Sequence, residues 1–140
     1  MSANKRVVLT DKAPAPREGV LNQAIVAGGT VYCSGQIAVD PATGKVVEGG
    51  VVEHTVNMPN PSGIPHQIIK NLTAVLEAAG TSIDNVVKVN IFIADIKDFN
   101  AMNEVYMQYW GETKPARSCI QAQPPVAGLP VEIECIAVMP

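Results

Sequence analysis

The stretch HQIIKNLTAVLEAAGTSIDNVVKVNIFIAD, residues 66–95, carries two hydrophobic patterns of different period, and these decide the fold class. Over residues 66–79 the apolar positions recur at helical spacing, and Gly80 follows as a C-terminal stop, which predicts a helix. Over residues 85–95 apolar and polar residues alternate, which predicts a strand with one buried face. The apolar residues of that strand are Val87, Val89, Ile91 and Ile93.

Shorter patterns on either side predict further strands. Residues 24–39 are typical of two strands around a Gly28-Gly29 turn, with Ser34-Gly35 interrupting the second strand. A glycine inside a strand often marks a bulge or a close approach of another group to the backbone, although a plain kink is the more common interpretation. Strands at 117–123 and 131–138 close the chain.

A second helix is predicted between an Asp98 N-cap and Gly111. The residues expected to face inward from it are Phe99, Met102, Tyr106, Tyr109 and Trp110, and this aromatic stripe is interpreted as core. The resulting order of elements predicts an α+β fold, a mixed sheet packed on one face by two helices.

The composition suits a single domain over residues 1–140. Hydrophobic residues make up 47% and charged residues 16%, so the surface is thinly charged, and part of it is expected to meet another subunit. The net charge is −3 with scattered cations, which argues against a nucleic-acid partner.

No apolar run approaches the roughly 18 residues of a membrane span, and the basic N-terminus is not followed by the apolar run of a secretory signal. We therefore expect a cytoplasmic protein without a membrane partner. The three cysteines lack metal-ligand spacing, and His54 and His66 form no metal motif. The sequence thus predicts reduced thiols and no metal site.

Residues 54–67, HTVNMPNPSGIPHQ, are rich in proline, glycine and asparagine. They are interpreted as a surface loop, with a lid or rim over a pocket as the alternative, since long loops in compact domains are often used in this way.

The closing strands place charges in an apolar context. Residue parity puts Arg117 and Cys119 on one face of their strand, and Glu132 and Glu134 on one face of theirs. If the two strands pair antiparallel, Arg117 lies opposite Glu134 and diagonal to Glu132. This arrangement is either an ordinary cross-strand ion pair or a site where the arginine binds a carboxylate and a glutamate handles a proton.

Several sequence blocks together resemble the YjgF/RidA family of enamine/imine deaminases. These blocks are AGGTVYCSGQI (27–37), VLEAAG (75–80), MNEVY (102–106), PARSC (115–119) and VEIECIAV (131–138). The resemblance extends from about Gly19 to Val138. It implies a chorismate-mutase-like fold, assembled as a homotrimer with active sites between subunits and requiring no cofactor.

The resemblance also implies roles for individual residues. Arg117 would hold the substrate carboxylate, and Glu132 would position or activate the hydrolytic water. Cys119 would contact the substrate through its backbone, while Glu134 would lie outside the core mechanism. Ser34, Gly35 and Asn103 would line the pocket.

Two departures from the common family pattern point to a particular branch. Leu21 stands in GVLNQA (19–24), where members usually carry a tyrosine, and residues 54–67 look like an insertion. Both resemble the 2-aminomuconate deaminase branch of bacterial aromatic degradation, which forms 4-oxalocrotonate (2-hydroxymuconate) and ammonia. The far carboxylate of that substrate would bind His66, the amides near Ser62-Gly63, or Arg17.

Two other functions remain open. A generic 2-iminobutanoate/2-iminopropanoate deaminase would use the same chemistry on smaller substrates. A non-catalytic ligand-binding or chaperone-like trimer would need neither Arg117 nor Glu132.

Overall fold

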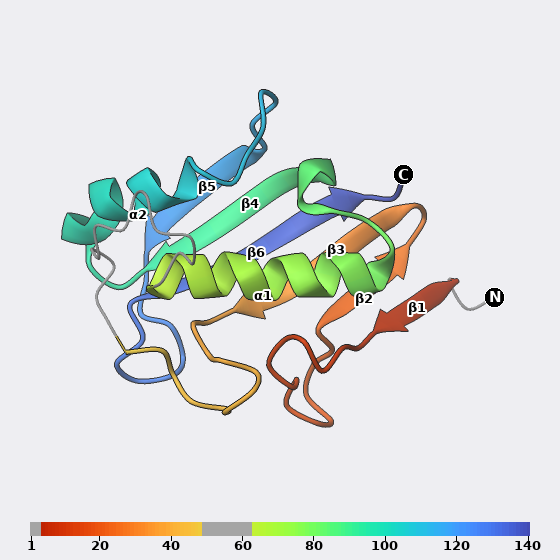
Figure 1. Cartoon of the computed structure of the whole chain (residues 1–140), viewed down its shortest axis with the longest axis horizontal. Coiled ribbons are helices and arrows are strands. Elements are labelled where there is room, and N and C mark those ends of the chain that lie inside the picture. Colours follow the sequence, from red (N-terminus) through yellow and green to blue (C-terminus); the bar gives the residue numbers. More distant parts are fainter. Residues whose placement is uncertain (1–3, 49–62) are drawn as a thin grey trace.

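The computed structural model describes residues 4–48 and 63–140. The described strands form a six-stranded sheet in the order β1-β2-β3-β6-β4-β5 (Figure 1). The strands are β1 (Lys5–Val8), β2 (Ala24–Ala27), β3 (Thr30–Gln36), β4 (Val86–Ile93), β5 (Ala116–Gln121) and β6 (Val131–Val138). The helices are α1 (Ile64–Ala79) and α2 (Phe99–Tyr106). The short 3₁₀ turn η1 (Ile83–Asn85) connects α1 to β4, and η2 (Ile96–Asp98) leads directly into α2. The predicted mixed sheet with two helices is confirmed.

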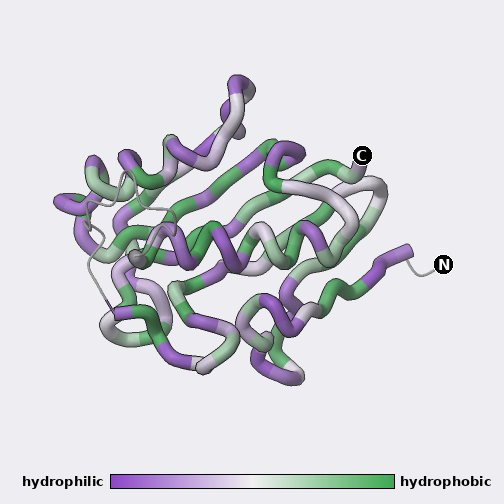
Figure 2. The backbone as a smooth tube through the Cα atoms, viewed as in Figure 1, coloured by the Kyte–Doolittle hydropathy of each residue, from purple (hydrophilic) through white to green (hydrophobic). Residues whose placement is uncertain are grey.

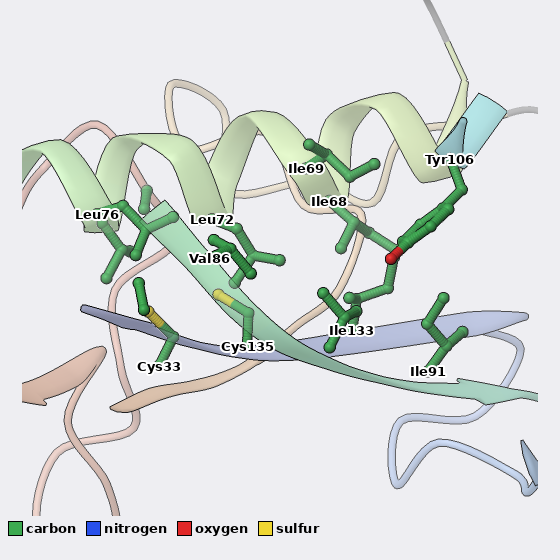
Figure 3. Close-up of a cluster of buried hydrophobic side chains, with 14 of the residues drawn as sticks. Cys33, Ile68, Ile69, Leu72, Leu76, Val86, Ile91, Tyr106, Ile133 and Cys135 are labelled. Atoms are coloured by element: carbon green, nitrogen blue, oxygen red, sulfur yellow. The ribbon is translucent and has the colours of Figure 1, made fainter. Parts of the chain in front are cut away.

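The core lies between α1 and the sheet. Ile68, Leu72 and Leu76 point from α1 toward the strands, where Cys135 and Ile133 of β6 meet them (Figure 3). Each of these side chains is at most 2% exposed, and burying one stabilises the fold by about 1.5–3 kcal/mol. We call the opposite side of the sheet, which neither helix covers, the open face.

Helix α1 begins two residues before the prediction because Ile64 and Pro65 belong to its first turn. Proline is accepted there, since the first helical N–H groups have no partner within the helix. Gly80 ends the helix with φ 94°, a left-handed conformation that favours glycine, as predicted. In Figure 2 hydrophilic and hydrophobic segments alternate along α1, in keeping with its single apolar face.

The predicted loop at 54–67 is wrong at its C-terminal end. Residues 64–67 form the first turn of α1. The part from 54 to 62 lies outside the described residues.

The β2–β3 hairpin follows the prediction. Ala27 pairs with Thr30 around Gly28 and Gly29, whose φ angles of 56° and 74° suit the tight turn that matches strand twist. The register of β3 against β6 shifts between Cys33 and Gln36, so Ser34-Gly35 forms a bulge rather than a plain kink.

The predicted pairing of the two closing strands is wrong. Strand β4 lies between β5 and β6, pairing parallel with β5 and antiparallel with β6. Arg117 is the partner of Val89, while Asn90 and Phe92 are the partners of Glu134 and Glu132. The chain reverses through α2 between β4 and β5, which supplies the long crossover that parallel neighbours require.

Smaller corrections concern β4 and α2. Val87 is 45% exposed because the register shifts between Val86 and Lys88, so the buried row begins at Val86. Asp98 makes no capping hydrogen bond. The cap belongs to Asp95, which accepts from the N–H of Lys97 and starts η2.

Helix α2 is shorter than predicted, ending at Tyr106, although Trp110 beyond it is still buried. Tyr109 is half-buried.

Gln23 fixes the segment that enters β2. It is 1% exposed, and its Oε1 accepts from the N–H of Thr10 at 2.7 Å. Its Nε2 donates to the carbonyl oxygens of Thr10, Ala13 and Pro14 at 3.0, 3.3 and 2.9 Å. One side chain therefore provides hydrogen-bond partners for backbone groups of three residues in the loop after β1.

Replacing Gln23 with alanine should lower the free energy of unfolding by about 2–4 kcal/mol, because buried backbone groups lose their partners. Urea unfolding followed by circular dichroism measures this. The control is Gln108→Ala in the exposed turn after α2, which should change the free energy by less than about 0.5 kcal/mol. Equal free energies of unfolding for the two variants would contradict the stabilising role assigned to Gln23.

Candidate active site

The Arg117 guanidinium is held on the helix-covered face of the sheet. Its register partner Val89 is buried, and neighbouring residues across a sheet point the same way. The guanidinium carbon lies 4.7 Å from the ring centre of Tyr106 and 5.7 Å from that of Phe99. Its Nη1 donates to Oδ1 of Asn103 at 2.6 Å. These aromatic and amide contacts restrict the guanidinium to one orientation.

The sequence pattern predicts Phe99 and Tyr106 as core alone and does not predict their contact with Arg117. With Asn103 they stand at positions i, i+4 and i+7 of α2, a spacing that puts all three on one helix face. That spacing, next to an arginine predicted to bind substrate, is the signal that could have revealed the contact.

Cys119 lies two residues beyond Arg117 on the same face of β5 and is half-buried. Burial raises the pKa of its thiol, and the nearby Arg117 charge opposes this only in part. A thiol that stays protonated is a poor nucleophile. This state is consistent with the predicted backbone role, which remains a prediction.

Glu132 projects from the open face of β6, beside the bulge of β3. A Cβ placed on Gly35 would lie 2.9 Å from Cδ and 3.0 Å from Cγ of Glu132, so the side chain leans across the backbone at this glycine. The glycine therefore marks a close approach as well as a bulge. Burial raises the pKa of the Glu132 carboxyl, and the charge of Glu134 raises it further.

The predicted proximity of Arg117 to Glu132 within one chain is wrong. Val89 and Phe92, their respective partners, are separated by three positions on β4 and point to opposite faces. Because β4 stands between their strands, the two residues are also about 10 Å apart across the sheet. A small molecule cannot touch both within one chain.

Ser34 joins the turn that carries Leu21 to the bulge. Its Oγ donates to the carbonyl oxygen of Asn22 at 2.6 Å, and its N–H donates to that of Gln23 at 3.0 Å. Leu21 is 44% exposed in this turn. The structure thus brings Leu21, Ser34 and Gly35 to the Glu132 side, while Asn103 and Cys119 lie on the Arg117 side.

His66 belongs to neither group. It is buried in the first turn of α1, its Nδ1 is hydrogen-bonded to the Tyr109 hydroxyl, and burial lowers the pKa of the imidazole. His66 lines a pocket of about 980 Å³ along α1. Among the described residues that line this pocket, neither Arg117 nor Glu132 occurs. Arg17 is exposed, and Ser62 lies outside the described residues.

Within residues 4–48 and 63–140, no group of three or more His, Cys, Asp or Glu side chains could hold a metal ion. In the same part of the chain, no helix is both long and apolar enough to cross a membrane.

Residues 10–139 match the protein family described as endoribonuclease L-PSP. The chain belongs to this family, which includes the RidA proteins. It is 40% identical over 134 residues to the human 2-iminobutanoate/2-iminopropanoate deaminase, covering 96% of this chain and 90% of the human protein.

Two solved structures resemble the fold. A Rid-family protein of unknown function from Yersinia pestis, YyfA, has a TM-score of 0.84 and 38% identity, covering 96% of this chain and 99% of that one. The Escherichia coli TdcF structure with bound serine has a TM-score of 0.77 and 33% identity, covering 96% and 99%.

Replacing Gly35 with alanine should displace the Glu132 carboxylate, which occupies the space of the added methyl group. Because the displaced atoms are the end of a flexible, half-buried side chain, the free energy of unfolding should fall by at most about 1 kcal/mol. Chemical unfolding measures the cost. Gly111→Ala is the matched control because nothing lies within 4 Å of its added methyl group.

In a Glu132→Ala background the cost of Gly35→Ala should largely disappear, since the obstructing side chain is gone. If Gly35→Ala still lowers the free energy of unfolding in the Glu132→Ala background, the added methyl group must clash with a group other than Glu132.

Proposed function

We propose that this protein is a hydrolytic deaminase of small 2-imino monocarboxylic acids and their enamine tautomers, such as 2-iminobutanoate and 2-iminopropanoate. The observation that carries the proposal is the Arg117 guanidinium, fixed by Tyr106, Phe99 and Asn103 where a planar carboxylate can bind it. The human relative, whose name states this activity, supports the same substrate class.

The reaction uses the residues as follows. The enamine tautomerises to the imine, and Arg117 binds the substrate carboxylate and orients the C=N bond. Glu132 takes a proton from water as the water oxygen bonds to the imine carbon. That proton passes to the nitrogen and gives a carbinolamine. Its hydroxyl group then gives up its proton to the nitrogen as the C–N bond breaks and the C=O bond forms, so that ammonia departs and a 2-keto acid remains. A carboxylate with a raised pKa accepts the proton more readily, which suits Glu132 to this role.

The remaining predicted residues would line the pocket. Cys119 would offer its backbone to the substrate, and Asn103 would act by holding Arg117. Ser34 and Gly35 would shape the space around Glu132, and Leu21 would contact the substrate's side chain. The reaction as written draws on no metal or organic cofactor.

We further propose that the site forms between copies of the chain in a homotrimer. Since one chain keeps Arg117 and Glu132 on opposite faces, a substrate that touches both must lie between two chains. The open face also carries an apolar row formed by Val7, Ile25, Tyr32 and Ile136 on adjacent strands. Tyr32 is 50% exposed in one chain, which suits burial against a neighbour.

The finer expectation of 2-aminomuconate as substrate receives no support from the comparisons, and His66 is a poor ligand for its far carboxylate because it is buried and bonded to Tyr109. Glu134 lies beside Glu132 and would repel a second carboxylate there. We therefore favour monocarboxylate substrates and retain 2-aminomuconate as a comparison substrate. Cytoplasmic location and the lack of a nucleic-acid partner remain predictions, although the family description names an endoribonuclease.

Arg117→Ala and Glu132→Gln should each slow the deamination of 2-iminobutanoate by about 10²–10⁴-fold, through lost binding and lost proton transfer respectively. The substrate is generated in situ from 2-aminobutanoate by an amino-acid oxidase, and its decay and ammonia release are followed above the spontaneous rate. Glu104→Gln on the exposed face of α2 serves as control. Equal rates for wild type and both variants would contradict the proposed roles of Arg117 and Glu132, and would favour the alternative of a non-catalytic trimer.

Mixing the two inactive variants tests the shared site. In a three-membered ring refolded from equal amounts of each, roughly one quarter of the sites would combine an intact Arg117 with an intact Glu132, and activity should recover to about that level. Light scattering checks that the assembly is a trimer. A monomer, or mixed trimers without recovery, would overturn the shared-site proposal but not the activity itself.

A further inference from the structure

Glu134 is held beside Glu132 by a residue of the neighbouring strand. The two glutamates are two positions apart on β6, so both project from the open face, and both are half-buried. Asn90 is the register partner of Glu134 on β4, and its Nδ2 donates to Oε1 of Glu134 at 2.9 Å. A second negative charge is thereby fixed near the proposed base.

The two carboxylates lean toward different strands. Glu132 reaches across β3 at Gly35, while Glu134 turns to Asn90 on β4. They therefore do not share a proton in one hydrogen bond. The effect of Glu134 on Glu132 is that of a fixed charge at a roughly constant separation.

Other charged and titratable groups near Glu132 are oriented away from it or are less confined. On β4, Lys88 has its Nζ 3.2 Å from Oγ of Ser118, on the side of β4 that faces β5. On β3, Tyr32 pairs with Ile136, further along β6. The turn next to β3 carries Arg17 and Glu18, and both are exposed. Among the described residues, Glu134 is thus the charged side chain that shares a strand and a face with Glu132 and is held in place by a hydrogen bond.

The roles that the family resemblance implies include none for Asn90, and they place Glu134 outside the core mechanism. We propose that Asn90 and Glu134 act on the reaction through Glu132, as a fixed negative charge that makes Glu132 a stronger base. The inference rests on the proposed function, with Glu134 as a positioning residue that does not touch the substrate. In keeping with it, burial and then the Glu134 charge raise the pKa of Glu132.

The direct test is a ¹³C NMR titration of the Glu132 carboxyl in the intact assembly, assigned by comparison with Glu132→Gln. Glu134→Gln removes the charge but retains an oxygen that accepts from Asn90, so the Glu132 midpoint should shift to lower pH. Glu77→Gln on α1 removes the same charge at an exposed site and should leave the midpoint unchanged. A Glu134→Gln midpoint that stays with the control, or rises, would overturn the proposal.

Asn90→Ala tests the anchor separately. Freed from Asn90, the Glu134 carboxylate can turn to solvent, so the Glu132 midpoint should shift in the same direction but by less than in Glu134→Gln. A midpoint equal to that of wild type would show that the anchor has no part in the effect.

The pH dependence of kcat/KM connects the pair to catalysis. Because the base must be deprotonated, the acid limb in Glu134→Gln should move to lower pH, with a lower plateau from the weaker base. A limb that stays in place while the NMR midpoint moves would overturn the catalytic part of the proposal. If Glu132→Gln were as active as wild type, the proposed function would fail instead, and the NMR result would still report on the pair.

Discussion

Strand β4 pairs parallel with β5 on one side and antiparallel with β6 on the other, and the chemistry of this protein depends on that central position. The pairing directs Arg117 and Cys119 toward the helices and Glu132 toward the open face. It also places α2 over the β5 edge, where Asn103 and two aromatic rings hold the guanidinium. Under the proposed function, a single chain thus carries two half-sites, and the geometry of its sheet is the argument for a shared site between copies.

The Glu132 half-site depends on a backbone irregularity. The extra residue in β3 places a glycine where the Glu132 side chain crosses, and a larger residue would occupy that space. The hydroxyl of Ser34 ties the same bulge to the turn that carries Leu21, and Gln23 secures the loop before it. Packing and backbone hydrogen bonds therefore fix the backbone that the Glu132 side chain crosses.

Much of the fold could be predicted because its signals are local. The helical period of residues 66–79, the Gly28-Gly29 turn and the alternation in β6 each depend on neighbouring residues, and each is confirmed. The register shift at Val87 and the early end of α2 could not be read in this way, since tertiary packing decides them. Among the predicted site residues, Asn103 contacts Arg117, and its place in a substrate pocket stays a prediction, whereas His66 is buried in the first turn of α1.

By itself, the sequence predicted α1 and every strand except β1, with most of their buried faces, but not the extent of α2. Its family resemblance singled out Arg117 and Glu132 as the residues to examine. Residue parity shows which side chains share a face of one strand, but it does not show which strands are neighbours. Only the tertiary structure decided that β4 separates β5 from β6, and with it the relation of the arginine to the glutamate. The physical reason is that strand order is set by long-range pairing and by the crossover through α2, which leave no periodic signal in the local sequence.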